Sequence, residues 1–321
     1  MTYNLAHKAQ KQSLIKSPLN YIGGKYRILP QILPLFPKRV DSFVDLFCGG
    51  LNVAINIDTD FAIMSPFASA QKNRIFAKHI ICNDNLAYLV ELYEFLRLQP
   101  LQSSLAELEQ IIAKYALNHT NAQGYNALRD DYNAHKSPLK LLALIAHSFN
   151  HQIRFNNAHK FNTPFGKDRS SFNATMKQNL IAFVEALQGK NIAFYALDFR
   201  ECLSRIQFTK QSFLYADPPY LITQGTYNDG KRGFSGWSEN LEIALLESLA
   251  NLHKNGVRFA LSNVLIHKEK TNMILQRWIE NNSFFVTRIN AHYTNASYHT
   301  KHKDKAKTQE VLITNYNPSK V

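Results

Sequence analysis

Short apolar runs, each bounded by polar or turn-forming residues, recur in the first and last thirds of the chain. Their β-branched and aromatic content is typical of buried strands. Between several of them the apolar positions follow helical spacing, as in residues 241–253, which stop just before Gly256. Strands that alternate with helices predict an α/β domain with a mostly parallel sheet. The predicted strands span residues 42–47, 79–82, 192–197, 212–216, 257–261, 284–292 and 310–316.

The middle third of the chain is predicted to be almost entirely helical. Ser104 and Glu107 have the spacing of a capping box ahead of a helix over residues 105–117. Pro138 is placed to begin another helix over residues 139–149. Because this long helical block interrupts the alternation of strands and helices, we expect an inserted domain.

A basic and aromatic segment, residues 151–166, follows the helical block and carries an Asn-Asn pair. Such a pair favours a tight turn, and we predict a β-hairpin. We therefore expect an inserted, mainly helical domain with a hairpin over residues 89–188. Residues 1–88 and 189–321 are then expected to form the α/β domain together.

The composition limits the classes of partner and compartment. Of the 321 residues 45% are hydrophobic, which is enough to build more than one core. Lys and Arg number 37 against 24 acidic residues, and the net charge of +13 favours a polyanionic partner such as nucleic acid. The first residues lack the apolar core of a signal peptide, and no run approaches the ~18 apolar residues of a membrane span. We expect a cytoplasmic protein that does not span a membrane.

The three cysteines are Cys48, Cys82 and Cys202, and none belongs to a Cys-x-x-Cys pair. An odd and scattered set argues against both a disulfide framework and a zinc site. We expect small buried thiols and no bound metal.

The residues that follow the predicted strands are candidates for a ligand site, because open α/β sheets bind ligands at the carboxyl ends of their strands. Asp45 and Phe47 lie at the end of the first strand. The pair Gly49–Gly50 follows them and allows a ligand to approach the backbone closely. It is not the G-x-G-x-x-G of nicotinamide enzymes, and an ordinary turn is the alternative interpretation.

Three more strand ends carry carboxylates. Asp84 follows the second strand, where it could bind a ribose diol, cap the next helix, or do both. Asp198 and Phe199 follow the third, a pair suited to accepting from an adenine amine and stacking on its ring. The fourth strand ends at the rigid segment 217–220, Asp-Pro-Pro-Tyr, which by itself is as consistent with a turn as with a site.

In this order the motifs resemble those of the Dam-type DNA adenine methyltransferases, the alpha-ordered group of exocyclic-amine methylases. The resemblance covers nearly the whole chain and is strongest to phage-encoded members, which also have leucine in place of glycine at position 51. The glycine motif precedes the inserted segment and Asp-Pro-Pro-Tyr follows it, whereas the beta group reverses the two motifs. The matching segments are YIGGK (21–25), FVDLFCGGLNV (43–53), ICND (81–84), IRFNNAHKFNTPFGK (153–167), DPPYLIT (217–223), SNV (262–264) and ITNY (313–316).

The resemblance implies a Rossmann-like, S-adenosylmethionine-dependent methyltransferase domain with a defined reaction. The Asp217 carboxylate and the Pro218 carbonyl would accept the two hydrogens of an adenine amine, which localises the nitrogen lone pair toward an electrophilic methyl group. Pro219 would fix the geometry of the loop, and Tyr220 would stack on a base flipped out of duplex DNA. Asp217 then orients the amine and need not be a strong base.

By the same resemblance the cofactor contacts residues around the strand ends. Lys25 is placed to meet its carboxylate, Asp84 its ribose, and Asp198 with Phe199 its adenine. The expected cofactor-binding residues are Tyr21, Gly24, Lys25, Asp45, Phe47, Cys48, Gly49, Gly50, Asp84, Asp198, Phe199 and Asp217.

The expected DNA contacts lie in the hairpin and in a later segment. By resemblance Arg154 reads a guanine through two hydrogen bonds and Pro164 contacts a thymine methyl group. The glycine-rich segment 225–237 is expected to close over the flipped base and the cofactor. The other expected DNA contacts are Phe155, Asn156, Asn157, Lys231 and Arg232.

The resemblance also implies a target and partners. The target is the adenine of GATC, with a longer site containing GAT as the alternative. Asn20 stands where some relatives have a lysine that helps to read the first base, and residues 58–78 form an insertion to which we assign no role. The implied partners are double-stranded DNA and, functionally, a cognate restriction endonuclease, with the protein a monomer or weak dimer.

Two other functions fit parts of the sequence. A protein glutamine methyltransferase has a similar fold but uses Asn-Pro-Pro-Tyr and lacks a basic hairpin, so Asp217 disfavours it. A DNA-binding regulator with an inactive methylase domain would require eroded motifs, and none is eroded. Transfer of a labelled methyl group to DNA, RNA and protein, compared side by side, discriminates among the three.

Overall fold

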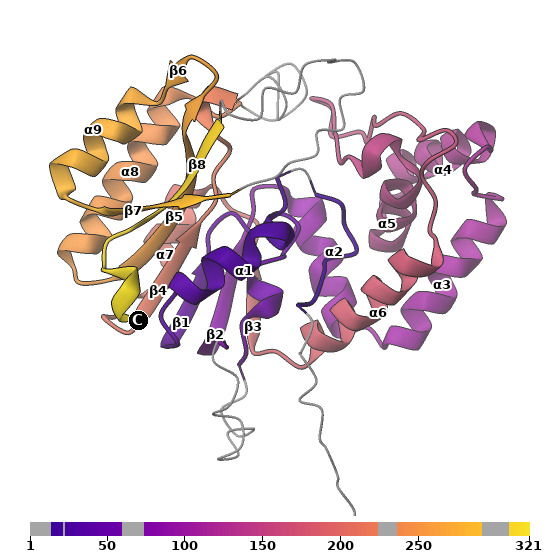
Figure 1. Cartoon of the computed structure of the whole chain (residues 1–321). Coiled ribbons are helices and arrows are strands. Elements are labelled where there is room, and N and C mark those ends of the chain that lie inside the picture. The colour runs from indigo at the N-terminus through magenta and orange to yellow at the C-terminus, as the bar shows by residue number, and fades with distance from the viewer. Residues whose placement is uncertain (1–13, 22, 60–73, 224–235, 291–307) are drawn as a thin grey trace, which may run out of the picture.

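The computed structural model describes residues 14–21, 23–59, 74–223, 236–290 and 308–321. At its centre is a sheet in the order β3-β2-β1-β4-β5-β8-β7, with β6 paired to β5 (Figure 1). Strands β1 to β5 pair in parallel, whereas β8 runs antiparallel to both β5 and β7. The strands are β1 (Arg39–Asp45), β2 (Phe76–Asn83), β3 (Ile192–Tyr195), β4 (Ser212–Ala216), β5 (Arg258–His267), β6 (Lys270–Thr271), β7 (Phe285–Ile289) and β8 (Thr308–Thr314).

The prediction of a mostly parallel α/β sheet is confirmed. Each predicted strand overlaps an observed one, and β4 has the predicted bounds. The two-residue strand β6 was not predicted, because it is too short to carry a hydrophobic pattern. The chain passes from β1 outward to β3 and then returns to β4 on the other side of β1. The strand order therefore reverses between β1 and β4, where open α/β sheets bind ligands.

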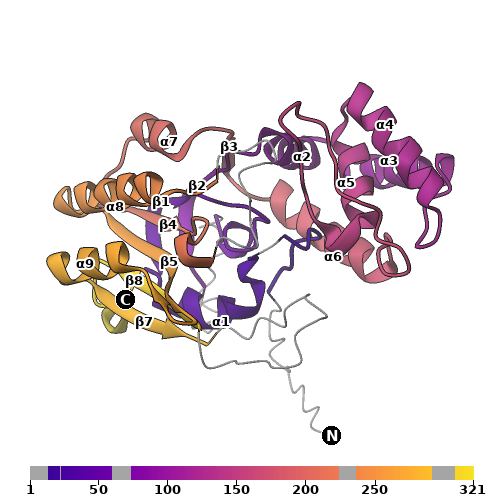
Figure 2. The ribbon, with the colours of Figure 1, turned by 90° about the horizontal axis from the view of Figure 1, so that it is seen from above.

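Alternate residues of the strands face two different cores, as the period of two requires. Phe43 and Phe213 pack in one cluster, and their neighbours Val44 and Leu214 pack in the other. Figure 2 shows helices α7, α8 and α9 on one side of the sheet and α1 on the other. These helices are α1 (Leu29–Ile32), α7 (Phe199–Arg205), α8 (Glu239–Lys254) and α9 (Met273–Asn282).

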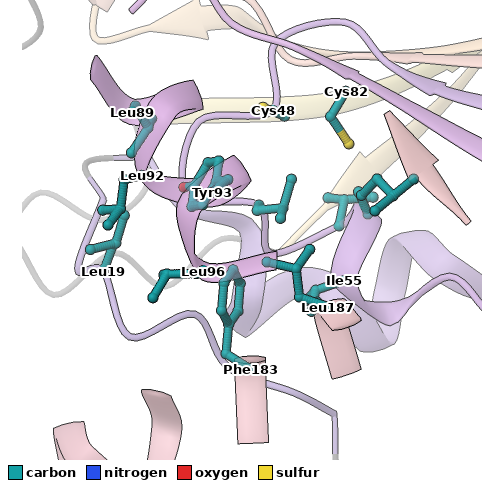
Figure 3. Packing of buried hydrophobic residues seen from close by; sticks show 14 of the residues in the cluster. Leu19, Cys48, Ile55, Cys82, Leu89, Leu92, Tyr93, Leu96, Phe183 and Leu187 are labelled. Carbon is teal, nitrogen blue, oxygen red and sulfur yellow. The ribbon is translucent and has the colours of Figure 1, made fainter. Parts of the chain in front are cut away.

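The predicted helical block is also confirmed, and it lies between β2 and β3. Its helices share one buried cluster with the sheet, so they pack against it through a continuous core. Figure 3 shows Tyr93 and Leu96 from α2 near Phe183 and Leu187 from α6. No helix in the described part of the chain combines the length and apolar character of a membrane span. The block consists of α2 (Ala87–Leu98), α3 (Leu101–Lys114), α4 (Ala122–Ala134), α5 (Pro138–His147) and α6 (Ala174–Gln188).

The predicted capping box at Ser104 and Glu107 is wrong. Helix α3 already begins at Leu101, directly after Pro100, so Ser104 lies inside the helix. The Ser104 backbone N–H donates to the Pro100 carbonyl, as in a helical turn. Pro100 has a backbone angle suited to a helix start, and this outweighs the side-chain motif. The prediction that Pro138 begins α5 is confirmed.

The segment 151–166 turns back on itself where the hairpin was predicted. The Asn156 N–H donates to the Lys160 carbonyl at 2.9 Å, and the Asn156 side chain accepts from Lys160 N–H at 3.0 Å. The arms meet in an isolated antiparallel bridge between Phe155 and Phe161. The turn is therefore present, but neither arm forms a continuous strand.

Candidate active site

Most predicted site residues meet in one pocket at the carboxyl ends of β1, β2 and β4. The turn after β1 forms one wall, and the segment after β4 forms another. Asn52 and Tyr215 also line the pocket and were not predicted. The predicted residues that line it are Tyr21, Gly24, Lys25, Asp45, Phe47, Cys48, Gly49, Gly50, Asp84, Asp217, Pro218, Pro219 and Tyr220.

The glycine turn is shaped by its contact with Tyr21. Gly49 has a φ of +44°, and a Cβ there would lie 2.8 Å from the Tyr21 ring. A Cβ on Gly50 would lie 2.8 Å from Tyr21 Cβ. The turn is also held from both sides: Gly49 N–H donates to Asp84 Oδ2 at 3.0 Å, and the Tyr93 hydroxyl donates to the Gly49 carbonyl at 2.6 Å. Glycine is therefore required at this close approach.

Position 51 is a second point of backbone strain in the same turn. Leu51 has a φ of 59°, in the left-handed region that favours glycine. Its side chain is fully buried in the core, which offsets this backbone preference. The leucine noted in the sequence thus occupies a conformation suited to glycine.

Asp84 links the glycine turn to the inserted helices. Its Oδ1 accepts from Leu86 N–H at 2.9 Å, just before α2 begins at Ala87. Its Oδ2 accepts from Gly49 N–H. Burial raises the pKa of Asp84, and these two backbone hydrogen bonds oppose the rise. The proposed ribose contact would use acceptor capacity that remains on the same two oxygens.

Asp45 ends β1 as a deeply buried carboxyl group, 1% exposed. Burial, together with the negative charge of Asp217, raises the pKa of Asp45 to about 8. Its Oδ1 is buried without a hydrogen-bond partner among the described residues. A cationic ligand in the pocket would compensate this carboxyl group when it ionises.

Lys25, Asp217 and Tyr220 form a compact network with one further residue. Lys25 Nζ is 2.7 Å from Asp217 Oδ2 and donates to the Gly23 carbonyl at 2.9 Å. The Tyr220 hydroxyl is 3.0 Å from Asp217 Oδ1. Burial raises the pKa of Asp217, and the nearby Lys25 opposes the rise. Both oxygens of Asp217 are therefore engaged within the protein.

Glu310 of β8 is the further residue, and the sequence interpretation missed it. Its side chain is 2% exposed, and its Oε1 lies 3.1 Å from the Tyr220 hydroxyl and 3.8 Å from Lys25 Nζ. The signal that could have found it is a carboxylate at the start of an apolar run: all residues from Glu310 to Thr314 are buried in β8. A carboxylate on a buried face is rarely without a functional or structural partner.

An aromatic group lies beside the glycine turn. The rings of Phe47 and Phe199 have centroids 5.6 Å apart, and Trp237 lies 5.7 Å from Phe47 and 5.8 Å from Phe199. The Trp237 indole N–H donates to Glu242 at 2.6 Å, which fixes the orientation of the indole. Phe199 is thus part of a packed group and does not itself line the pocket.

The structure does not bring Asp198 into the pocket. It caps α7 by accepting from Arg200 N–H, and it forms an ion pair with the Arg200 side chain at 2.8 Å. Hydrogen bonding to Arg200 holds the pKa of Asp198 below its usual value. A partner two residues away therefore occupies this carboxylate.

The residues of the hairpin segment divide into buried and exposed ones. Phe155 is 1% exposed, and its ring stacks on Tyr88 with centroids 4.6 Å apart. Arg154 is partly exposed, whereas Asn157 and Pro164 are exposed. The surface of the segment thus presents Arg154, Asn157 and Pro164, while Phe155 belongs to the core of the helical block.

Some predictions fall on positions that the structure does not describe. Lys231 and Arg232 lie there, with most of the glycine-rich segment 225–237. So do residues 60–73, most of the insertion noted in the sequence. In the described residues no group of three or more His, Cys, Asp or Glu side chains could hold a metal ion.

Comparison with known proteins bears directly on this site. The family model described as D12 class N6 adenine-specific DNA methyltransferase matches residues 21–295, which include all of the pocket motifs through Asp-Pro-Pro-Tyr. Glu310 lies beyond the matched range.

Three relatives illustrate the similarity. The chain is 42% identical to the type II methyltransferase M.FokI of Planomicrobium okeanokoites over 96% of its length and 44% of the relative. It is 42% identical to the modification methylase StsI of Streptococcus sanguinis over 98% of its length and 45% of the relative. A DNA adenine methylase of Salmonella typhi is 27% identical, over 76% of the chain and 79% of the relative.

These comparisons refine the resemblance seen in the sequence. The chain spans less than half the length of the two modification methylases. Its identity to them is nonetheless higher than its identity to the DNA adenine methylase, so the Dam-type resemblance is the more distant one. The family match and the two 42% relatives show that the chain belongs to the D12 class of N6 adenine-specific DNA methyltransferases.

Proposed function

We propose that the protein transfers a methyl group from S-adenosylmethionine to the N6 amine of an adenine flipped out of duplex DNA. The observation that carries this proposal is the position of Asp217. It follows β4 at the switch point of the sheet, two prolines come after it, and it lines the same pocket as the glycine turn. A hydrogen-bond acceptor on a rigid loop beside a ligand pocket is what orientation of an exocyclic amine requires.

The pocket fits a zwitterionic cofactor that carries an additional cation. Lys25 would hold the carboxylate of S-adenosylmethionine, Asp84 its ribose, and the buried Asp45 would face its positive charge. When bound, the cofactor supplies an electrophilic methyl group on a sulfonium. The ring of Phe47, fixed by Phe199, supports the cofactor's adenine, and Asp198 is the peripheral member of this set because Arg200 already occupies it.

The protein's own contribution to the reaction is orientation of the amine. Asp217 and the Pro218 carbonyl accept its two hydrogens, and Pro219 restricts the backbone that aims the carbonyl. Tyr220 offers its ring to the flipped base. Ionised Asp217 is the stronger acceptor, and burial raises its pKa, so activity is expected to fall as the pH falls through that pKa.

We assign target recognition to the hairpin segment of the inserted helices, residues 151–166. Arg154 reads a guanine and Pro164 contacts a thymine methyl group, while the buried Phe155 supports the segment from behind. GATC is the proposed site. The higher identity to modification methylases favours a role in restriction–modification, with a restriction endonuclease as the functional partner. A longer site that contains GAT is the second candidate.

The test compares acceptors and then maps the site. Purified protein is incubated with methyl-labelled S-adenosylmethionine and, in parallel, duplex DNA, RNA and a protein extract. We expect label in DNA alone, and sequencing that detects methylated adenine should place it within GAT. Label in protein glutamine would replace this proposal with the competing one, and DNA binding without any transfer would favour the inactive regulator.

A further inference from the structure

The hydroxyl group of Tyr220 lies between two carboxylates. It is 3.0 Å from Asp217 Oδ1 and 3.1 Å from Glu310 Oε1. A tyrosine hydroxyl has one proton and donates to one acceptor at a time. When both carboxylates are ionised, the two hydrogen bonds are therefore alternatives.

Lys25 connects the same two carboxylates. Its Nζ is 2.7 Å from Asp217 Oδ2 and 3.8 Å from Glu310 Oε1, and it lies 5.1 Å from the centre of the Tyr220 ring. An ammonium group has three protons to donate. Both of the side-chain donors that hold Asp217 thus also reach Glu310.

In the proposed reaction the adenine amine becomes a further donor to Asp217, and the acceptor strength of its two oxygens is divided among more partners unless one of the present donors moves to another acceptor. The adenine amine must donate to the Asp217 carboxylate, whose Oδ1 accepts from Tyr220 and whose Oδ2 is paired with Lys25. Displacing a donor within a buried network costs free energy unless the donor finds another acceptor. Glu310 is within hydrogen-bond distance of the Tyr220 hydroxyl and forms an ion pair with Lys25 at 3.8 Å, so it can receive the hydroxyl proton without a rearrangement of the backbone.

We propose that Glu310 is a positioning residue for methyl transfer, which takes over the Tyr220 hydroxyl and shares Lys25 while Asp217 accepts the adenine amine. This inference rests on the proposed function and extends it to a residue of β8. Glu310 touches neither substrate nor cofactor in this scheme, and it acts through Tyr220 and Lys25.

The main variant is Glu310→Gln, which keeps the size of the side chain and removes its charge. We expect the single-turnover rate of adenine methylation to fall about tenfold to a hundredfold. The affinities for S-adenosylhomocysteine and for DNA should stay within about twofold of wild type, because the residue contacts neither. A wild-type rate in this variant overturns the proposal.

The pH profile separates positioning from a merely structural role. The charge of Glu310 raises the pKa of Asp217, and the hydrogen bond from Tyr220 lowers it. The acid limb of kcat/KM for DNA, which reports the free enzyme, should therefore move to lower pH in Glu310→Gln and to higher pH in Tyr220→Phe. An acid limb that stays in place in Glu310→Gln overturns the proposal.

Glu242→Gln is the matched control for the loss of a buried carboxylate. Glu242 is fully buried on α8 and accepts from Trp237, Asn263 and Asn272, outside the Asp217 network. Whatever this variant does to stability, its acid limb should coincide with that of wild type. An equal displacement in both variants would mean that the shift is unspecific, and this also contradicts the proposal.

If thermal unfolding shows that Glu310→Gln does not fold, Glu310→Asp is used to test the proposal instead. It keeps the charge but withdraws the acceptor from Tyr220, so the transfer rate should fall while cofactor affinity is kept. A wild-type rate in Glu310→Asp overturns the proposal. Wild type assayed in parallel distinguishes failure of the proposed function from failure of the role of Glu310. If wild type methylates no adenine, the proposed function is refuted as well. If wild type is active and the Glu310 variant is unaffected, only the role of Glu310 is refuted.

Discussion

Replacing Asp45 with asparagine should stabilise the cofactor-free protein at neutral pH, by an amount that grows with pH. Asp45 is buried at the end of β1, and burial together with the charge of Asp217 raises its pKa to about 8. In the unfolded chain an aspartate titrates near ~3.9. The folded protein therefore holds this proton more tightly than the unfolded chain does.

The sign and the size of this pH dependence follow from the linkage between proton binding and folding. Because the folded pKa is the higher one, the stabilising effect of the proton is complete below the unfolded pKa and is lost as the pH rises toward the folded pKa. Each pH unit inside this window removes about 1.4 kcal/mol from the free energy of unfolding. From pH 5 to pH 7 wild type should lose about 3 kcal/mol relative to Asp45→Asn.

The assay is urea unfolding of both proteins at pH 5, 6 and 7 without cofactor. Asp198→Asn is the control, because pairing with Arg200 lowers the pKa of Asp198 and its contribution should be constant across this range. A constant difference between wild type and Asp45→Asn would mean that Asp45 titrates normally. That result would refute the argument that burial and the charge of Asp217 raise the pKa of Asp45.

Three further predictions concern ligand and target recognition. Asp84→Ala and Lys25→Ala should each weaken the binding of S-adenosylhomocysteine about tenfold or more in calorimetric titration, because each removes a hydrogen-bonded charge. The DNA affinity of the cofactor-free protein should not change. Wild-type cofactor affinity in both variants would show that these residues do not belong to the site. Gly49→Ala should lower both the affinity for S-adenosylhomocysteine and the melting temperature, because a Cβ there lies 2.8 Å from the Tyr21 ring. Gly189→Ala is the control and should change neither, because the nearest atom to its Cβ is 3.6 Å away. Equal effects of the two substitutions would contradict the close-approach argument. Arg154→Ala should cost roughly 1–3 kcal/mol of discrimination at one base pair, measured on single-base variants of the mapped site, and a uniform loss over all sites would indicate a phosphate contact instead.

The strands and the core of the pocket could be predicted because their signals are local. Apolar runs located β4 with its observed bounds, and a parallel sheet necessarily brings its carboxyl ends to one edge. The sequence alone thus places Asp45, Asp84 and Asp217 at one edge of the sheet, and all three line one pocket there. The bounds of β5 were less well predicted: the predicted strand ended at residue 261, whereas β5 continues through the buried polar residues Ser262 and Asn263 to His267.

The features that escaped prediction depend on competition or on distant contacts. Ser104 has a capping motif, but Pro100 starts the helix earlier. Asp198 sits at a strand end, but Arg200 two residues away pairs with it. Glu310 meets Tyr220 across 90 positions of sequence, and no local pattern encodes that contact. The burial of Phe155 likewise depends on the ring of Tyr88, which belongs to a different element of the inserted block.

The most direct test of the central claim is the identity of the methylated nucleoside. Duplex DNA is incubated with methyl-labelled S-adenosylmethionine and either wild type or Asp217→Ala, digested to nucleosides and analysed by mass spectrometry. We expect the label in N6-methyl-2′-deoxyadenosine for wild type and no product above background for Asp217→Ala, with DNA binding retained. Label in any other nucleoside, or undiminished transfer by the Asp217 variant, would contradict the account.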